Sequence, residues 1–409
     1  MRSGCISFPL WQVALPWEFV RREGGDIFAL CLSAVLVLFS PLLRLNGLFQ
    51  PNSFDVMAWT GVYYYLYRYF KEEKAGHLYA AALLLSLGFL NKYNVFFLVA
   101  GLLPALLLRP ERKVFRRSHF YGAMGLFLVL VGPNIYWQFR HEFPVLEHMR
   151  LLQTQHLVHV NRSDFFLEQF MFLFCSLPFL FSLWRLKQQH LWFLFSLLFS
   201  LALFVYFRAK PYYVLGLYPF LWGLAVLYFS RINLGYYRWI FLLWPIGFTL
   251  WSFPRHYPVK SAENLVAEGR VHRWEDGTAH PISQDFADMI GWRELAQKTE
   301  KALTAFDDPD RVLVLCDNYG QAGAINYYTE GRVKAQSFHG DYGVWLDTDT
   351  PYLHLIRIKS RDGRDMEFQE TSPHFTAAAI ADSLANPLAR EYLTTVFVFR
   401  DAKYPFNAF

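Results

Sequence analysis

Four polar stretches interrupt a chain that is otherwise strongly apolar as far as residue 253, and each carries side chains that could do chemistry. An ionisable group at membrane depth is costly and usually faces a cavity or a partner, so such stretches are the best candidates for a functional site. The four stretches are residues 47–55 (GLFQPNSFD), 90–94 (LNKYN), 131–163 (VGPNIYWQFRHEFPVLEHMRLLQTQHLVHVNRS) and 207–219 (FRAKPYYVLGLYP).

The first two stretches offer a carboxylate and a cation. Asp55 lies just inside an apolar run, where it could act as a base or as an orienting acceptor. Equally, Ser53 and Asp55 stand where the caps of a first helical turn belong. Lys92, followed by Tyr93, is the one cation at the tip of an apolar hairpin and could hold a phosphate at the level of the lipid headgroups. The alternative for Lys92 is a snorkelling side chain that marks the membrane interface.

Two cations and several tyrosines open the stretch 207–219. Arg208 and Lys210 precede an apolar run, and Tyr212 and Tyr213 follow directly behind them. A helix N-terminus carries partial positive charge and free N–H donors, so this arrangement suits an anionic headgroup. Ordinary turn residues are the alternative. The two cations depart from the charge pattern of the loops, described below, and this departure favours a site.

The stretch 131–163 is the densest in polar residues. Its candidate site residues are Asn134, Arg140, Glu147, His148 and Arg150. The stretch resembles an amphipathic helix that lies on the membrane over a cavity, with its leucines and Met149 facing down. His156 and His159 share a helical face, but no third metal ligand has a defined spacing. We therefore interpret them as structural histidines at the interface.

Membrane helices must position these groups, because about 20 apolar residues in a helix cross the hydrocarbon of a bilayer. The chain is 54% hydrophobic and 19% aromatic, and its apolar runs end near residue 253. The sequence therefore predicts a mainly α, polytopic transmembrane bundle over 1–253 and a soluble α/β domain over 254–409. The eight or nine expected spans are 27–43, 53–70, 77–89, 93–108, 119–138, 164–184, 189–206, 211–229 and 238–253.

Clusters of Lys and Arg follow every second span and predict the orientation of the bundle, because such clusters accumulate in short cytoplasmic loops. Lys92, Lys210 and the C-terminal domain then lie on the opposite face. The formal net charge of +5 is modest, and no basic stripe with interleaved stacking residues indicates nucleic-acid binding. The clusters are Arg68, Lys71 and Lys74; Arg109, Arg112, Lys113, Arg116 and Arg117; Arg185 and Lys187; and Arg231 and Arg238.

The C-terminal segment shows the alternation of a small α/β domain. We expect an amphipathic helix over 285–306, a buried strand over 311–316, and a helix that continues through Ala324. Later strands are expected over 352–358 and 394–399. The turn 318–321 (NYGQ) follows the first strand and could bind a small polar ligand, but it lacks the glycine spacing of a nucleotide site.

Taken together, the motifs QPNSFD, LGFLNKYN, VGPNIYWQFRHEFPVLEHMR, HLVHV and KPYYVLGLYP resemble the bacterial members of glycosyltransferase family 39. These are relatives of the dolichyl-phosphate-mannose protein mannosyltransferases and of the lipid A aminoarabinose transferase. The order and spacing match over most of residues 20–253. FADMIGW (286–292) and DNYGQAGAI (317–325) are similar to the domain that follows in this subfamily.

The resemblance implies a GT-C membrane fold and an inverting sugar transfer. A polyprenyl-phosphate sugar would be the donor, at the periplasmic face of a bacterial inner membrane, and the acceptor is not specified. Lys92, Arg208 and Lys210 would hold the lipid phosphate, assisted by the aromatic and polar residues named above. No cofactor is specified, and a divalent cation is compatible with the reaction.

A general base is the part of the family pattern that this sequence does not match. The family carries an acidic pair in a loop after its first span, and residues 1–25 resemble the tail of a later span instead. We therefore expect this chain to lack that span and its acidic loop, so that Asp55 or Glu147 would have to substitute. The alternatives are a non-catalytic scaffold or lipid-binding remnant, and a transporter. A transporter is disfavoured because the chain shows no repeated halves.

Overall fold

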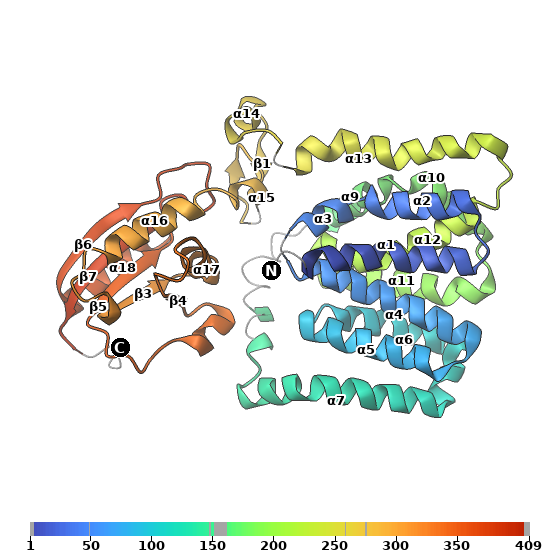
Figure 1. Ribbon diagram of the computed structural model, residues 1–409, viewed down its shortest axis with the longest axis horizontal. Helices are drawn as coiled ribbons and strands as arrows, with labels where there is room; N and C mark the ends of the chain where they lie inside the picture. The colour runs from blue at the N-terminus through green and yellow to red at the C-terminus, as the bar shows by residue number, and fades with distance from the viewer. Residues whose placement is uncertain are drawn as a thin grey trace. The chain divides into compact units, whose positions relative to one another are not determined.

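The computed structural model describes residues 4–48, 50–146, 149–150, 162–257, 259–274 and 276–404. The chain divides into two compact units, Met1–Phe143 with Leu152–Val259 and Pro144–Leu151 with Lys260–Phe409. The first unit is a helical bundle and the second contains a small sheet, as the sequence predicts (Figure 1).

The helices of the bundle run side by side, with α7 and α13 at its two edges (Figure 1). The described α-helices are α1 (Gly4–Arg22), α2 (Ile27–Leu38), α3 (Leu42–Gly47), α4 (Asn52–Glu72), α5 (Ala75–Asn91), α6 (Val95–Leu107), α7 (Ser118–Arg140), α9 (Arg162–Phe174), α10 (Leu177–Leu180), α11 (Leu191–Tyr206), α12 (Tyr218–Phe229) and α13 (Leu243–His256). The 3-10 helices are η1 (Pro110–Arg116), η3 (Phe181–Arg185), η4 (Gln188–His190), η5 (Pro211–Leu217) and η6 (Gly235–Leu242).

All nine expected spans fall on helices, but several are shorter or more broken than their apolar runs. The run 27–43 is divided into α2 and α3 next to Pro41, and the run 164–184 bends by 90° between α9 and Leu177. By length and composition, three described helical segments are able to cross a membrane: Ser118–Arg140, Gln188–Tyr206 and Pro211–Phe229. The bent pair makes a fourth if its two arms form one span.

The helix α1 was not among the expected spans, although residues 1–25 resemble the tail of one, and it carries several charged residues. These charges gather at its C-terminal end, where the Glu18 carboxylate accepts hydrogen bonds from Arg21 and Arg22 at 2.6 and 2.7 Å. Because these charged groups are paired with one another, the rest of α1 can pack against the bundle. Phe19 and Val20 are fully buried in the bundle.

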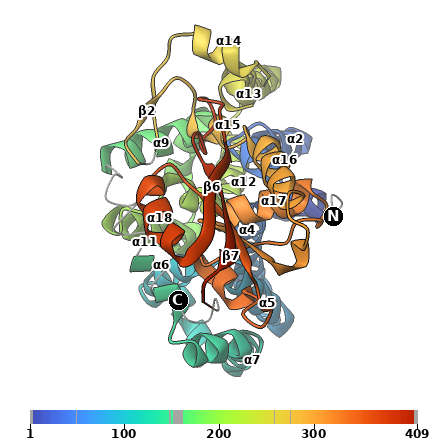
Figure 2. The ribbon, with the colours of Figure 1, turned by 90° about the vertical axis from the view of Figure 1, so that its left-hand side faces the viewer.

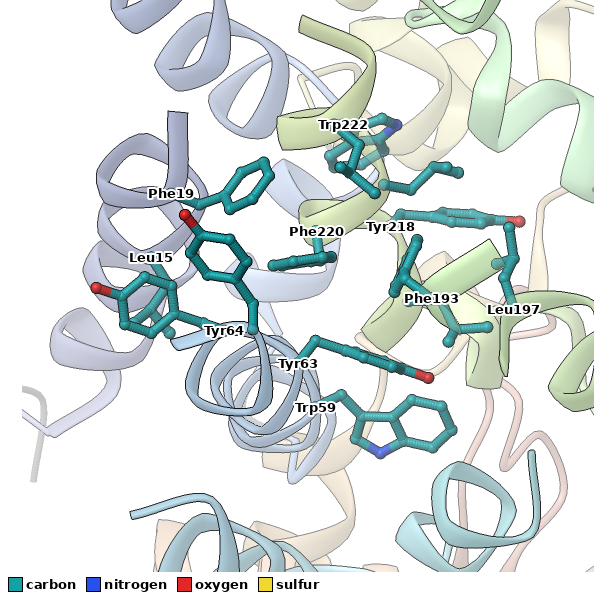
Figure 3. Close-up of a cluster of buried hydrophobic side chains, with 14 of the residues drawn as sticks. Leu15, Phe19, Trp59, Tyr63, Tyr64, Phe193, Leu197, Tyr218, Phe220 and Trp222 are labelled. Carbon is teal, nitrogen blue, oxygen red and sulfur yellow. The ribbon is translucent and has the colours of Figure 1, made fainter. Parts of the chain in front are cut away.

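Large aromatic side chains form the core of the bundle and hold α4 against its neighbours (Figure 3). The Tyr63 ring meets the edge of Phe193 at 4.8 Å and lies 6.0 Å from Phe220. The Tyr63 hydroxyl also shares a hydrogen bond of 2.9 Å with Ser196, so its polar end is satisfied. Because lipid is as apolar as these side chains, close packing and internal hydrogen bonds must hold such a bundle together.

The basic clusters that were used to predict orientation lie together at one end of the bundle. Arg117 pairs with Glu73 at 3.0 Å, and Arg109 donates to the Gln188 carbonyl oxygen at 2.9 Å. Arg231 donates to the carbonyl oxygen of Glu23. These contacts involve the loops after α1, α4, α6, η3 and α12, while Asp55 lies at the other end of α4.

The second unit is built on a five-stranded mixed sheet of order β4-β3-β5-β7-β6. The strands β4, β3 and β5 are parallel, and β7 and β6 are antiparallel. The strands are β1 (His272–Arg273), β2 (Ala279–His280), β3 (Val312–Cys316), β4 (Ala335–Ser337), β5 (His354–Lys359), β6 (Phe375–Ser383) and β7 (Thr395–Ala402). The helices are α14 (Ala262–Ala267), α15 (Gln284–Ala287), α16 (Trp292–Leu303), α17 (Tyr319–Tyr328), α18 (Arg364–Thr371), η7 (Pro309–Arg311), η8 (Gly340–Trp345) and η9 (Ser372–His374).

Helices cover both faces of this sheet, α16 and α17 on one side and α18 on the other (Figure 2). Side chains alternate between the two faces of a strand, and Val312 and Val314 accordingly join the cluster under α16 and α17, whereas Leu313 joins the cluster near α18. The expected helix over 285–306 is wrong as a single helix. It is divided into α15 and α16 at Gly291, whose φ of +94° only glycine adopts readily.

Candidate functional site

Four segments meet at the end of the bundle opposite the basic clusters: the start of α4, the tip 91–94 between α5 and α6, the C-terminal part of α7, and η5. The tip connects them because each of its side chains reaches a different partner. Asn91 donates to the Pro51 carbonyl oxygen at 2.9 Å. Lys92 and Asn94 bond to residues of α4, and Tyr93 bonds to α7. The tip 91–94 therefore connects the hairpin of α5 and α6 to α4 and α7.

Lys92 carries a half-buried positive charge whose direct contacts are with neutral groups. Its Nζ donates to Asn52 Oδ1 at 2.7 Å. It lies 3.9 Å from the centre of the Tyr213 ring and 5.4 Å from that of Tyr212. The ring faces attract a cation, and the Asp55 carboxylate also attracts Lys92 electrostatically, without an ion pair among the described contacts. The ammonium is thus held in a fixed position with capacity for an anion.

Asp55 is buried, with only 4% of its surface exposed, and both of its carboxylate oxygens accept hydrogen bonds. Trp59 Nε1 donates to Oδ1 and Asn94 Nδ2 donates to Oδ2, each at 2.9 Å. Asn94 also reaches the Tyr213 carbonyl oxygen at 3.4 Å. Asp55 therefore ties α4 to the tip and, through Asn94, to η5. We call Asp55, Trp59 and Asn94 the Asp55 lock.

The lock requires a glycine on η5. A Cβ atom at Gly216 would lie 2.7 to 2.8 Å from atoms of Trp59, closer than side chains pack. The indole therefore lies directly against the η5 backbone, which holds its N–H toward Asp55 and keeps η5 near the tip. Figure 3 shows Trp59 in the same buried cluster as Tyr63 and Phe220.

Tyr93 fastens the tip to α7. Its hydroxyl donates to Asn134 Oδ1 at 2.9 Å and accepts from Gln138 Nε2 at 2.9 Å. Asn134 and Gln138 are one helical turn apart, so they face the same direction. Hydrogen bonds of this kind matter because most of the remaining surface of α7 is exposed in the described residues.

Replacing Tyr93 with phenylalanine is expected to loosen this attachment. The change removes both hydrogen bonds and leaves the ring in place, at a cost of about 1–3 kcal/mol. We expect a lower melting temperature of the detergent-solubilised chain and faster hydrogen exchange in α7. Tyr136→Phe is the matched control, because Tyr136 lies on α7 and its side chain is exposed. An equal effect of both changes would contradict the assigned contact.

The remaining predicted site residues do not all join Lys92. Lys210 directly precedes η5 and lies close enough to act on Lys92 electrostatically. Arg208 is exposed and takes a left-handed backbone conformation with φ of +51°, and no described contact links it to Lys92. Arg140 is exposed at the end of α7, and Arg150 is exposed beyond it. Glu147 and His148, like His156 and His159, lie outside the described residues.

Four residues of the site were missed by sequence reasoning although the sequence signals were present. Asn52 and Asn94 stand within the quoted motifs, and Trp59 follows Asp55 at the i,i+4 spacing that puts two side chains on one helical face. Gln138 has the same relation to Asn134. A search for polar partners at helical spacing would have found the Asp55–Trp59 pair.

The turn 318–321 of the soluble unit is filled by its own polar groups. Asn318 caps α17 by accepting from the Gln321 amide at 2.9 Å, and the buried Gln321 side chain donates to Ser360 and Glu391. At Asp317, burial raises the pKa, but Arg357 and the Ser360 amide outweigh it and hold the pKa of this carboxyl below its usual range. These contacts explain the turn 318–321 as a structural feature at the C-terminal end of β3. No group of three or more His, Cys, Asp or Glu in the described ranges is arranged to hold a metal.

The comparisons with known proteins agree with this architecture. Residues 5–137 match the family model of the dolichyl-phosphate-mannose-protein mannosyltransferases. ArnT from Cupriavidus metallidurans bound to undecaprenyl phosphate has a TM-score of 0.61 at 14% identity, with 97% of this chain and 83% of that chain covered. The resemblance to glycosyltransferase family 39 is confirmed.

The apo state of ArnT gives nearly the same result, with a TM-score of 0.60 at 13% identity over 97% of this chain and 83% of that chain. The structural match covers both units, so the GT-C fold extends from the bundle to a C-terminal domain. No curated protein matched this chain. At such low identity the structural likeness concerns the fold, and the chemistry of this glycosyltransferase-like chain depends on its own residues.

Proposed function

We propose that this chain is a membrane glycosyltransferase that moves a sugar from a polyprenyl-phosphate donor to an acceptor at the periplasmic face of a bacterial inner membrane. The observation that carries the proposal is Lys92, a half-buried cation at one end of the bundle whose direct contacts are with neutral groups. ArnT was crystallised with undecaprenyl phosphate, and we infer a donor of the same lipid-phosphate class here.

The charge change of the reaction explains why a fixed cation would help. The donor phosphodiester carries one negative charge. When the bond between the sugar C1 and the phosphate oxygen breaks, the oxygen keeps the electron pair, and the polyprenyl phosphate that leaves gains a second charge. A preorganised ammonium stabilises that developing charge more than it stabilises the donor, and only such a difference accelerates the chemical step.

The acceptor hydroxyl must form the new bond to C1 and give up a proton to a base. Asp55 and Glu147 were the two carboxylates expected for this step. The hydrogen bonds of Asp55 to Trp59 and Asn94 favour a positioning role for it, since both oxygens already have donors. Glu147 lies outside the described residues and stays a prediction.

The periplasmic location is supported by the charge distribution. The basic clusters gather at the end of the bundle opposite Lys92, and short loops rich in Lys and Arg are typical of the cytoplasmic side. The phosphate-binding end would then face the periplasm. The soluble unit, which follows α13, would lie on the same face as Lys92.

Membranes that contain the chain are expected to transfer radiolabelled sugar from a polyprenyl phosphate to endogenous acceptors. Lys210→Ala should lower that transfer about tenfold, which corresponds to about 1.4 kcal/mol. Lys113→Ala is the control, because Lys113 is an exposed cation at the opposite end. Equal transfer by wild type and Lys210→Ala would contradict the role of this cation.

A lipid-phosphate-binding protein without transfer activity is the second candidate, and the occupied carboxylate of Asp55 favours it. Binding needs only the cations, whereas transfer also needs a base. Retention of radiolabelled undecaprenyl phosphate, together with no transfer of radiolabelled sugar from the polyprenyl-phosphate donor, would therefore support this second function and overturn the first.

A further inference from the structure

Five apolar side chains form an exposed patch on the soluble unit, separate from the hydrophobic clusters of its core. Their exposed fractions are 80% for Trp345, 69% for Phe338, 53% for Val344, 52% for Tyr319 and 39% for Tyr342. We call this patch the aromatic surface. Clustered exposed apolar groups mark interaction sites far more often than single ones do.

Two neighbouring parallel strands, β3 and β4, bring these residues together at the C-terminal ends of the strands. Tyr319 begins α17 directly after β3, and the other four follow β4, which pairs with β3. The ring of Tyr319 lies 6.2 Å from that of Tyr342 and stacks on His339 at 5.2 Å with planes 6° apart. The start of α17 and the segment 338–345 therefore lie on one surface, so these side chains are not scattered.

The aromatic surface is not an uncovered part of the core. Both faces of the sheet already have their helices, α16 and α17 on one side and α18 on the other. The segment 338–345 (FHGDYGVW) contains no Lys or Arg, so it is unsuited to nucleic acid or an acidic protein. Its chemistry is that of rings with polar edges, which favour a membrane–water interface.

Chain connectivity identifies the partner. The helix α13 ends at His256 and α14 begins at Ala262, and the residues between them reach at most about 20 Å. The soluble unit is therefore permanently attached to a multi-pass membrane protein, and a lipid surface is always at high effective concentration near it. We propose that the aromatic surface docks into the headgroup region of the bilayer that the bundle spans. This proposal does not depend on sugar transfer.

The test uses the full chain in nanodiscs of phosphatidylcholine and phosphatidylglycerol, with a fluorescent NBD label on Val344→Cys. Cys5 and Cys31 are replaced by serine, whereas the buried Cys175 and Cys316 are kept. Doxyl-labelled phosphatidylcholine should quench the label at least twofold more than in the control Ile380→Cys, which lies on β6 and is 61% exposed. The emission at position 344 should also shift to the blue.

A second variant separates docking from simple proximity to the membrane. Phe338→Ser with Trp345→Ser should abolish the extra quenching at position 344, while the melting temperature of the chain stays unchanged, because both side chains are exposed. Equal quenching at 344 and 380 would overturn the proposal. So would a blue shift at 344 without lipid quenching, since another protein surface or a chain segment would then cover the patch.

Discussion

Removing the charge of Lys92 is expected to lower sugar transfer about 100-fold or more, the effect of losing a preorganised group at a developing charge. Lys92→Gln is the most informative change, because the glutamine amide can still donate to Asn52 Oδ1 while it offers no positive charge to a phosphate. Lys92→Arg should retain much of the activity. The measurement is initial transfer rates from a polyprenyl-phosphate sugar, with binding of radiolabelled undecaprenyl phosphate measured in parallel.

The two measurements distinguish binding from catalysis. If Lys92 acts mainly on the leaving phosphate, kcat should fall more than KM rises in Lys92→Gln. If it only anchors the lipid, KM should rise and kcat should change little. Lys71→Ala is a suitable control, because Lys71 is exposed and pairs with Glu23 at the other end of the bundle. Unchanged transfer by Lys92→Gln would exclude a role of this cation in the reaction.

The bundle and the sheet could be predicted from the sequence because their signals are local. Nine apolar runs predicted helices at nine places, and the apolar segment RVLVLC predicted the buried strand β3. The helix α1 was not named as a separate span, although residues 1–25 resemble the tail of one. The strand β6 was missed because its exposed residues, such as those of FTAAAIADS, carry no clear alternation.

The candidate site was predicted only in part, because its contacts join residues that are distant in sequence. Lys92 and Lys210 were both selected from the sequence, and they interact electrostatically, but their proximity depends on how α5 and α11 end in space. Asn94 to Asp55 is a contact over 39 positions, and Tyr93 to Asn134 one over 41. No local pattern specifies such pairs. Sequence reasoning therefore found the charges but could not distinguish a base from a lock at Asp55.

Substitutions at Asp55 make that distinction. In Asp55→Ala, the buried N–H groups of Trp59 and Asn94 lose their acceptor, and each unpaired donor costs about 1–3 kcal/mol. We expect a clearly lower melting temperature together with a loss of transfer. This result alone fits either role, because a base and a lock are both destroyed by alanine.

Asp55→Asn separates the two roles. Its carbonyl oxygen can still accept from Trp59, while its NH₂ group meets Asn94. Asn94 Oδ1 is buried and has no hydrogen-bond partner in the described part of the chain, so a rotated Asn94 amide can offer that oxygen as the acceptor. If Asp55 is part of a lock, the variant should keep nearly normal stability, and its transfer rate should stay within about tenfold of the wild-type rate. If Asp55 is a base, kcat should fall by about 10²–10⁴ without unfolding.

The exchanged pair Asp55→Asn with Asn94→Asp completes the test. Asn94→Asp alone brings two carboxylates together in a buried position, so it should be strongly destabilising. The double variant again has one carboxylate and one amide, with the charge moved from α4 to the tip. If Asp55 is a positioning residue, the exchange should restore melting temperature and transfer together, and the double-mutant cycle should give a coupling of about 1–3 kcal/mol. Restored stability without transfer would instead show that the carboxylate is needed at position 55 itself, as a base would be.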